Sequence, residues 1–205
     1  MNCFGFITVR TASSRLPQKC LLSIRGQKVI EHVIDRAKLI NGLAGVVVCT
    51  STEPEDDILE TIAKDKKVLC FRGSLKDKLK RYNDAAIKFG ADYVVLFDAD
   101  DLFCDPELNE LAIEQMKDEP CDFLRPPVGL VIGAFDFCIS ASALKLSCKI
   151  KDTDDTEMYE IYFSDPKRFK IRELKVSDPI FFSDQIRLTL DYQEDLDFFR
   201  RVFDE

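Results

Sequence analysis

The first half of the chain alternates between two hydrophobic periods. Short apolar runs rich in Val, Ile and Phe predict buried strands at residues 3–9, 45–50, 67–71 and 92–97. Between them, apolar residues recur at helical spacing around Ile30, Ile62 and Tyr82. Strands alternating with helices predict a mostly parallel sheet covered on both faces, a three-layer α/β/α fold.

The second half is less regular in its pattern. We expect helices at residues 106–116, 156–163 and 194–202, and strands at residues 131–139, 169–174 and 186–190. No Pro-, Gly- or Ser-rich linker interrupts the chain. The sequence therefore predicts a single domain over residues 1–205.

Composition narrows the class of ligand. The 205 residues are 46% hydrophobic and 32% charged, a balance typical of a folded globular protein. The net charge of -8 argues against a general nucleic-acid binder, which needs a basic face. A small anionic ligand is still compatible, because a local pocket of Arg and Lys can form on an acidic protein.

Other signals predict a cytoplasmic protein that does not enter a membrane. No apolar run reaches the roughly 18 residues that span a bilayer, and Met1 to Val9 lacks the basic start of a signal peptide. The eight cysteines form no C-x-x-C pair, and His32 is the single histidine. A Cys/His zinc site is therefore not expected, and the cysteines are interpreted as buried reduced thiols.

The segment Arg10–Lys19 directly follows the first predicted strand. Ligands bind beyond the carboxyl ends of the strands in open parallel sheets. Small residues allow close approach of a ligand to the backbone, and Arg10, Arg15 and Lys19 add cationic donors, as a triphosphate requires. Composition alone favours a solvated basic loop over a phosphate site, and no Walker pattern is present.

The order of residues in this segment adds a family resemblance. Residues 9–19, continuing through Leu21–Leu22 and residues 29–36, resemble the cytidylyltransferase family, which includes acylneuraminate and Kdo cytidylyltransferases. The likeness is greatest to the spore-coat-polysaccharide type. It implies the nucleotide-diphospho-sugar-transferase (Rossmann-like) fold. It also implies that the triphosphate of CTP is held by Arg10, Ser13 or Ser14, Arg15 and Lys19, with Lys19 also catalytic.

Two further segments resemble elements of the same family. The segment Phe71–Tyr82 is similar to an element whose arginine lies near the pyrimidine base, which implies base contacts for Arg72 and Ser74 and an anion contact for Arg81. The alternative is a surface helix with solvated charges. The segment Thr50–Asp57 also resembles a family element, but it is equally compatible with an ordinary polar turn.

The chemistry is expected at Asp98–Asp101, which follows an apolar strand. Adjacent carboxylates repel one another, and a hard divalent cation with oxygen ligands compensates them. The resemblance implies that Asp100 binds Mg²⁺. The sequence departs from the family at Leu96, Asp98 and Leu102, where relatives have Arg, Thr and Pro. These departures affect the expected acceptor pocket, for which Asp98 becomes a candidate contact.

The closing segment Leu188–Leu196 resembles the family's last motif. By this match Asp191 is the second Mg²⁺ ligand, and Asp100 and Asp191 are the catalytic carboxylates. Glu194 and Asp195 are better interpreted as acidic residues in a helix first turn.

The acceptor is expected to meet the irregular second half. Candidate contacts are Arg125, Lys151, Thr156 and Glu157, although a surface loop with solvated charges explains them equally well. Family members often dimerise, and the sequence leaves open whether this chain forms a homodimer.

The resemblance thus predicts a nucleotidyltransferase that transfers CMP from CTP to a sugar acid or related small anionic acceptor and releases pyrophosphate. Two alternatives stay open. One is a glycosyltransferase that uses a nucleotide sugar, with Asp98-Ala99-Asp100 as its D-x-D metal motif. The other is a non-catalytic nucleotide-binding protein, which the departures from the family pattern suggest.

Overall fold

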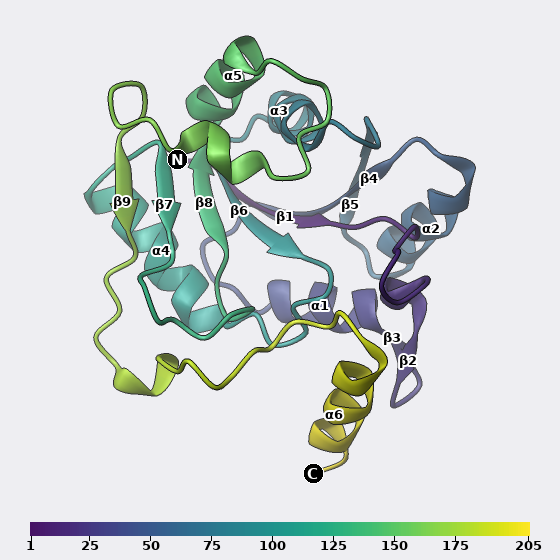
Figure 1. Cartoon of the computed structure of the whole chain (residues 1–205). Helices are drawn as coiled ribbons and strands as arrows, with labels where there is room; N and C mark the ends of the chain where they lie inside the picture. The colour runs from purple at the N-terminus through teal and green to yellow at the C-terminus, as the bar shows by residue number, and fades with distance from the viewer.

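A seven-stranded sheet lies at the centre of the computed structural model, which describes all 205 residues (Figure 1). Its strands are β1 (Cys3–Thr8), β4 (Gly45–Ser51), β5 (Leu69–Gly73), β6 (Tyr93–Asp98), β7 (Phe123–Arg125), β8 (Phe137–Ser140) and β9 (Ile171–Glu173). The strand order is β5-β4-β1-β6-β8-β7-β9. Only β8 runs antiparallel to its two neighbours, so the prediction of a mostly parallel sheet is confirmed.

Helices cover both faces of this sheet. They are α1 (Val29–Ala37), α2 (Asp57–Asp65), α3 (Lys78–Phe89), α4 (Pro106–Asp118) and α5 (Ala141–Ile150), whereas α6 (Gln193–Asp204) packs away from the sheet, against Ile24. Side chains alternate along a strand, so Val48 packs in one core cluster with α1, α2 and α4, whereas Val47 packs in the other with α3 and α5. The three-layer α/β/α prediction is therefore confirmed.

In the first half of the chain, local signals agree with the observed elements. Strands β1, β4 and β6 begin and end within one residue of their predicted limits, and β5 is shifted by two residues toward the C-terminus. Helix α3 starts where the side chain of Asp77 accepts a hydrogen bond from the N–H of Lys80, and it ends at Gly90 in the left-handed region.

The second half corrects several predictions. Residues 131–139 form a strand only over β8, and residues 186–190 form no strand but a single bridge from Arg187 to Ile132. Residues 156–163 contain the 3-10 helix η3 (Tyr159–Phe163), while β7 and α5 were not predicted. The chain turns at Gly133 with φ +87°, and a Cβ there would lie 2.7 Å from the Leu188 carbonyl oxygen. The close contact between these two segments interrupts both expected strands.

The C-terminal segment runs back to the strand ends. Leu196 and Phe199 of α6 pack with Ile24, which belongs to the hairpin of β2 (Ser23–Ile24) and β3 (Gln27–Lys28). His32 Nε2 lies 2.9 Å from the carbonyl oxygen of Ile24 and its ring packs against Phe203, so the single histidine has a structural role. No helix is long and apolar enough to cross a membrane.

Candidate active site

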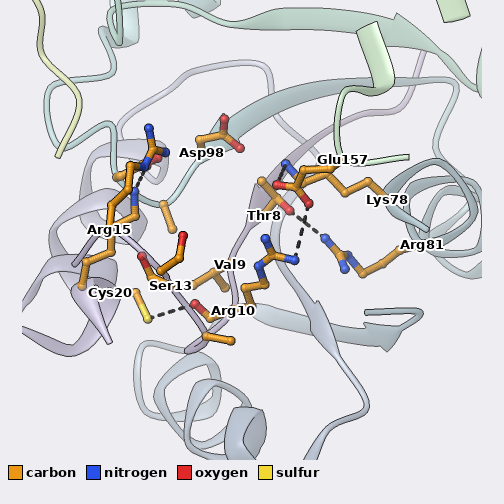
Figure 2. Close-up of a pocket in the computed structure, with 15 residues that line it drawn as sticks. Thr8, Val9, Arg10, Ser13, Arg15, Cys20, Lys78, Arg81, Asp98 and Glu157 are labelled. Atoms are coloured by element: carbon orange, nitrogen blue, oxygen red, sulfur yellow. Dashed lines mark hydrogen bonds and ion pairs between the residues drawn. The ribbon is translucent and has the colours of Figure 1, made fainter. Parts of the chain in front are cut away.

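A polar pocket opens at the carboxyl ends of β1 and β6 (Figure 2). Most of the residues predicted from the sequence as site residues line it. They are Arg10, Ser13, Ser14, Arg15, Lys19, Arg81, Asp98, Asp100 and Glu157. The position of the pocket agrees with the rule that ligands bind beyond the strand ends.

The loop between β1 and the 3-10 helix η1 (Lys19–Leu21) forms one wall of the pocket. It starts where the N–H of Val9 donates to Cys49 at 3.2 Å and ends where the N–H of Leu21 donates to Gln18 at 2.8 Å. Between these points, the backbone N–H groups of residues 12–16 donate no hydrogen bond to the protein. These groups are therefore free to bind a ligand.

Lys19 brings the two predicted metal ligands together. Its Nζ contacts Asp100, lies 3.0 Å from the carboxylate of Asp191 and donates to the Leu190 carbonyl at 2.9 Å. All three charged side chains are at most 16% exposed. Burial alone would lower the pKa of Lys19, but the two aspartates raise it above its usual value, so the ammonium is fully charged.

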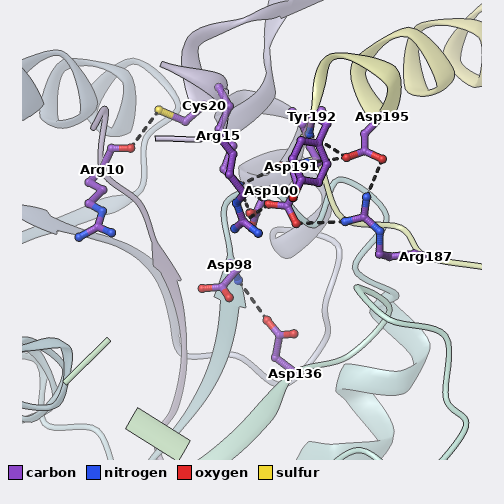
Figure 3. A network of polar contacts seen from close by, with 12 residues as sticks. Arg10, Arg15, Cys20, Asp98, Asp100, Asp136, Arg187, Asp191, Tyr192 and Asp195 are labelled. Carbon is purple, nitrogen blue, oxygen red and sulfur yellow. Dashed lines mark hydrogen bonds and ion pairs between the residues drawn. The ribbon is translucent and has the colours of Figure 1, made fainter. Parts of the chain in front are cut away.

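Asp191 is held by further contacts (Figure 3). Arg15 lies 2.9 Å and Arg187 3.1 Å from its carboxylate oxygens, and its N–H donates to Asp195 at 2.8 Å. Asp195 also accepts from the N–H of Tyr192 at 2.9 Å, which caps α6 as the first-turn interpretation requires. Arg187 was not predicted, because residues 187–191 form no helix and only the fold brings Arg187 next to Asp191.

A second carboxylate cluster lies beside the first. Carboxylate oxygens of Asp98, Asp101 and Asp136 lie within 4.8 Å of one another, and the N–H of Asp98 donates to Asp136 at 3.1 Å. Burial and the neighbouring carboxylates raise the pKa of Asp98 and of Asp136 above their usual values. Asp136 was not predicted, because it comes next to Asp98 only through the antiparallel pairing of β6 with β8. No local sequence pattern reveals that pairing.

Basic side chains surround Glu157 on the opposite wall of the pocket. The carboxylate of Glu157 lies 3.5 Å from Arg10 and 3.2 Å from Lys78. Arg81 is only 2% exposed and donates to the carbonyl of Ser74 at 2.7 Å and to Thr8 Oγ1 at 3.0 Å. It forms no ion pair and its Nε lacks a partner. A buried guanidinium without a carboxylate favours an anionic ligand.

Five predicted contacts are not brought to this pocket, because protein groups already hold them elsewhere. The hydroxyl of Thr156 donates to Asp77 at 3.0 Å and accepts the N–H of Leu79 at 3.0 Å. Arg72 pairs with Asp57 at 2.6 Å and Glu60 at 3.2 Å. The hydroxyl of Ser74 accepts the N–H of Asp77, and Lys151 pairs with Asp77 and Asp154. Arg125 pairs with Glu173 at 2.7 Å. None of these five side chains lines the pocket.

A loop with unbonded backbone N–H groups, basic side chains that converge on it and paired carboxylates at the strand ends are typical of one class of protein, the nucleotide-dependent transferases. A family model described as cytidylyltransferase matches residues 4–200. The chain therefore belongs to the cytidylyltransferase family and is a nucleotidyltransferase.

Individual relatives agree with this assignment. The chain is 27% identical, over 95% of its length and 80% of the relative's, to an uncharacterised protein of Methanocaldococcus jannaschii. It is 30% identical to the 8-amino-3,8-dideoxy-manno-octulosonate cytidylyltransferase of Shewanella amazonensis, over 80% of this chain. That alignment spans 65% of the Shewanella enzyme's length.

Solved structures share the fold. A cytidylyltransferase from Leptospira borgpetersenii superposes with a TM-score of 0.88 at 26% identity, covering 98% of this chain and 85% of that chain. A CMP:2-keto-3-deoxy-manno-octonic acid synthetase, solved with CTP, superposes with a TM-score of 0.75 at 17% identity, covering 100% and 99%.

Proposed function

We propose that this enzyme transfers CMP from CTP to a sugar acid or a related small anionic acceptor, with release of pyrophosphate. One observation carries the proposal: Asp100 and Asp191 come from distant parts of the sequence and converge on Lys19, the residue that ends the loop. The similar structure solved with CTP and the relative named for a sugar-acid substrate support the choice of donor and acceptor.

The loop supplies the groups that a triphosphate needs. The free N–H groups of residues 12–16 donate to phosphate oxygens, while Arg10 and Arg15 neutralise charge from either end of the loop. Because the protein holds these donors in place before the ligand arrives, little reorganisation is needed when charge shifts during the reaction.

The carboxylates of Asp100 and Asp191 fit a magnesium ion. Both offer oxygen ligands, which hard divalent cations prefer, and the ammonium of Lys19 already lies between them as a cation. When bound, magnesium supplies charge neutralisation and alignment of the phosphates. With magnesium held by Asp100 and Asp191, the ammonium of Lys19 would be free to contact a phosphate bound by the loop.

The reaction is an in-line displacement. An acceptor oxygen forms a bond to the α-phosphorus, the bond from this phosphorus to the bridging oxygen breaks, and pyrophosphate leaves. The chain contributes positioning and charge neutralisation through Arg10, Arg15 and Lys19.

The departures from the family pattern do not remove this machinery. Leu96 is 1% exposed and packs in the core under α3, and Leu102 is 0% exposed and packs against α6. Neither lines the pocket, whereas Asp98 does. The departures are therefore two core substitutions and one change in the pocket, which argues against loss of activity and for a changed acceptor.

A pyrophosphate-release screen tests the proposal. Four nucleoside triphosphates are combined with a panel of sugar acids, sugar phosphates and smaller phosphorylated compounds, with magnesium or with chelator. We expect release only with CTP, acceptor and magnesium together. Acceptor-dependent cleavage of a nucleotide sugar, without use of CTP, would identify a glycosyltransferase. Tight CTP binding without turnover on any acceptor would identify a binding protein.

The variant Asp100→Ala sharpens this test. Loss of a carboxylate that holds the metal should lower turnover by about 10³-fold or more, while the fold persists. Asp65→Ala, an exposed aspartate at the end of α2, is the matched control and should keep full turnover. Magnesium-dependent pyrophosphate release by Asp100→Ala at the control's rate would refute the assignment.

A further inference from the structure

A buried carboxylate outside the pocket contacts the loop directly. Asp56, the last residue of the 3-10 helix η2 (Pro54–Asp56), is 2% exposed. One of its oxygens accepts the backbone N–H of Thr11 at 2.8 Å and the hydroxyl of Thr11 at 2.7 Å. Its other oxygen accepts the hydroxyl of Ser51, at the end of β4.

These contacts keep Asp56 ionised without a basic partner. Burial alone would raise its pKa, but hydrogen bonds from Ser51 and Thr11 outweigh burial and hold the pKa below its usual value. Hydrogen bonds to a charged acceptor are roughly twice as strong as neutral ones. Asp56 therefore fixes Thr11 more firmly than an uncharged acceptor would.

The position of Thr11 makes this anchor relevant to the pocket. Thr11 follows Arg10 and directly precedes the free N–H groups of residues 12–16. On the other side of Arg10, Val9 is bonded to β4, and the Arg10 carbonyl accepts the thiol of Cys20 at 3.5 Å (Figure 2). Arg10 is thus held on both sides, and Asp56 fixes the direction in which the loop leaves it.

We propose that Asp56 is a positioning residue of the nucleotide site. It acts through Thr11 and holds the loop in its binding conformation before the nucleotide arrives, which reduces the ordering that binding requires. Asp56 itself does not line the pocket, so its loss weakens nucleotide binding rather than the chemical step. The inference rests on the proposed role of the loop in binding the triphosphate of CTP.

The test compares Asp56→Asn and Thr11→Val with the matched control Asp65→Asn. For the first two variants we expect the KM for CTP to rise about 10- to 100-fold, with kcat changed by less than about threefold. Thr11→Ser, which keeps the hydroxyl, should restore the KM. Without any nucleotide, hydrogen exchange of the hydrogen-bonded amides in residues 9–19, those of Val9, Thr11 and Lys19, should be faster in both variants than in the wild type.

Hydrogen exchange and enzyme kinetics together test the positioning role of Asp56 separately from the proposed function. If the wild type releases no pyrophosphate from CTP, the proposed function fails, but the exchange rates still decide whether Asp56 holds the loop. Unchanged exchange in residues 9–19 together with an unchanged KM would overturn the positioning role. A fall in kcat with an unchanged KM would also overturn it. If Asp56→Asn does not fold, the Thr11→Val and Thr11→Ser pair gives the same decision.

Discussion

Lys19 shows how one residue links the loop to the carboxylates. Asp100 and Asp191 repel each other unless a cation lies between them, and the Lys19 ammonium fills that place. A metal ion bound there would release the ammonium, and the nearest free anion would be a phosphate bound by the loop. Metal and nucleotide would then each favour binding of the other, because both remove Lys19 from competing contacts.

Asp56 gives the protein a predictable acid dependence. Its folded-state pKa lies below the ordinary value of 3.8, so its stabilising contribution is complete above that pH and is lost as pH falls through the folded pKa. We expect Asp56→Asn to be less stable than the wild type by about 2 kcal/mol above about pH 5. This difference should shrink below pH 3.8, as measured by urea unfolding across the pH range.

Asp65→Asn is the control for this measurement. Asp65 is exposed and forms no ion pair, so its loss should leave the pH dependence unchanged. A stability difference between Asp56→Asn and the wild type that grows as pH falls would contradict the assignment of a lowered pKa to Asp56.

Residues that follow directly from a local pattern were predictable. Asp100 lies just after an apolar strand, Asp191 lies in a recognisable closing motif, and the loop cations follow β1. Asp136 was not recognised, and Asp56 was noted only as part of the segment Thr50–Asp57 without a role, because their contacts depend on which strands become neighbours in the sheet. Arg72 and Lys151 lie away from the pocket for a related reason: the acidic partners that hold them are identified only by the folded chain.

Helix α6 couples the stability of the C-terminus to the position of Asp191. Asp195 accepts the N–H groups of Asp191 and Tyr192 and pairs with Arg187 at 2.6 Å. Asp195→Ala removes this cap and should destabilise the protein by about 1 kcal/mol. Pyrophosphate release should fall further than this loss of stability explains, because Asp191 loses its backbone anchor. Urea midpoints and turnover of the folded variant measure the two effects.

The adjacent residue provides the matched comparison. Glu194 lies in the same first turn, is exposed and forms no hydrogen bond or ion pair through its side chain. Glu194→Ala should therefore change stability by less than about 0.5 kcal/mol and leave turnover unchanged. Equal losses of turnover in both variants would show that α6 acts through its general charge and not through Asp195.

The elements of the first half were predictable because each carries its own signal. Strand β4 is a continuous apolar run, and α3 has both a cap and a terminating glycine. The elements of the second half depend on tertiary contacts instead. Strand β7 has only three residues. Residues 186–190, for which the pattern alone predicts a strand, instead pack closely against Gly133. Short elements of this kind are fixed by packing, which a local period does not describe.

The two core clusters, one on each face of the sheet, also determine what the cysteines can do. Six of the eight thiols are buried, while Cys70 and Cys148 are half-buried, and none forms a disulfide. Their burial agrees with the interpretation of the cysteines as residues that pack mostly in the core. Burial raises the pKa of both Cys70 and Cys148 to about 11, so even the accessible thiols carry little thiolate at neutral pH.

The reactivity of the buried thiols therefore measures global unfolding of the protein. With a thiol-specific reagent at pH 8, we expect no more than two cysteines to react while the protein stays folded, and all eight to react in urea. Mass spectrometry should identify the first two as Cys70 and Cys148. The other six should react together at the rate of global unfolding, because the sheet between the two cores opens cooperatively. Early modification of Cys49 or Cys138, which lie inside strands at 0% exposure, would show that the sheet opens locally instead.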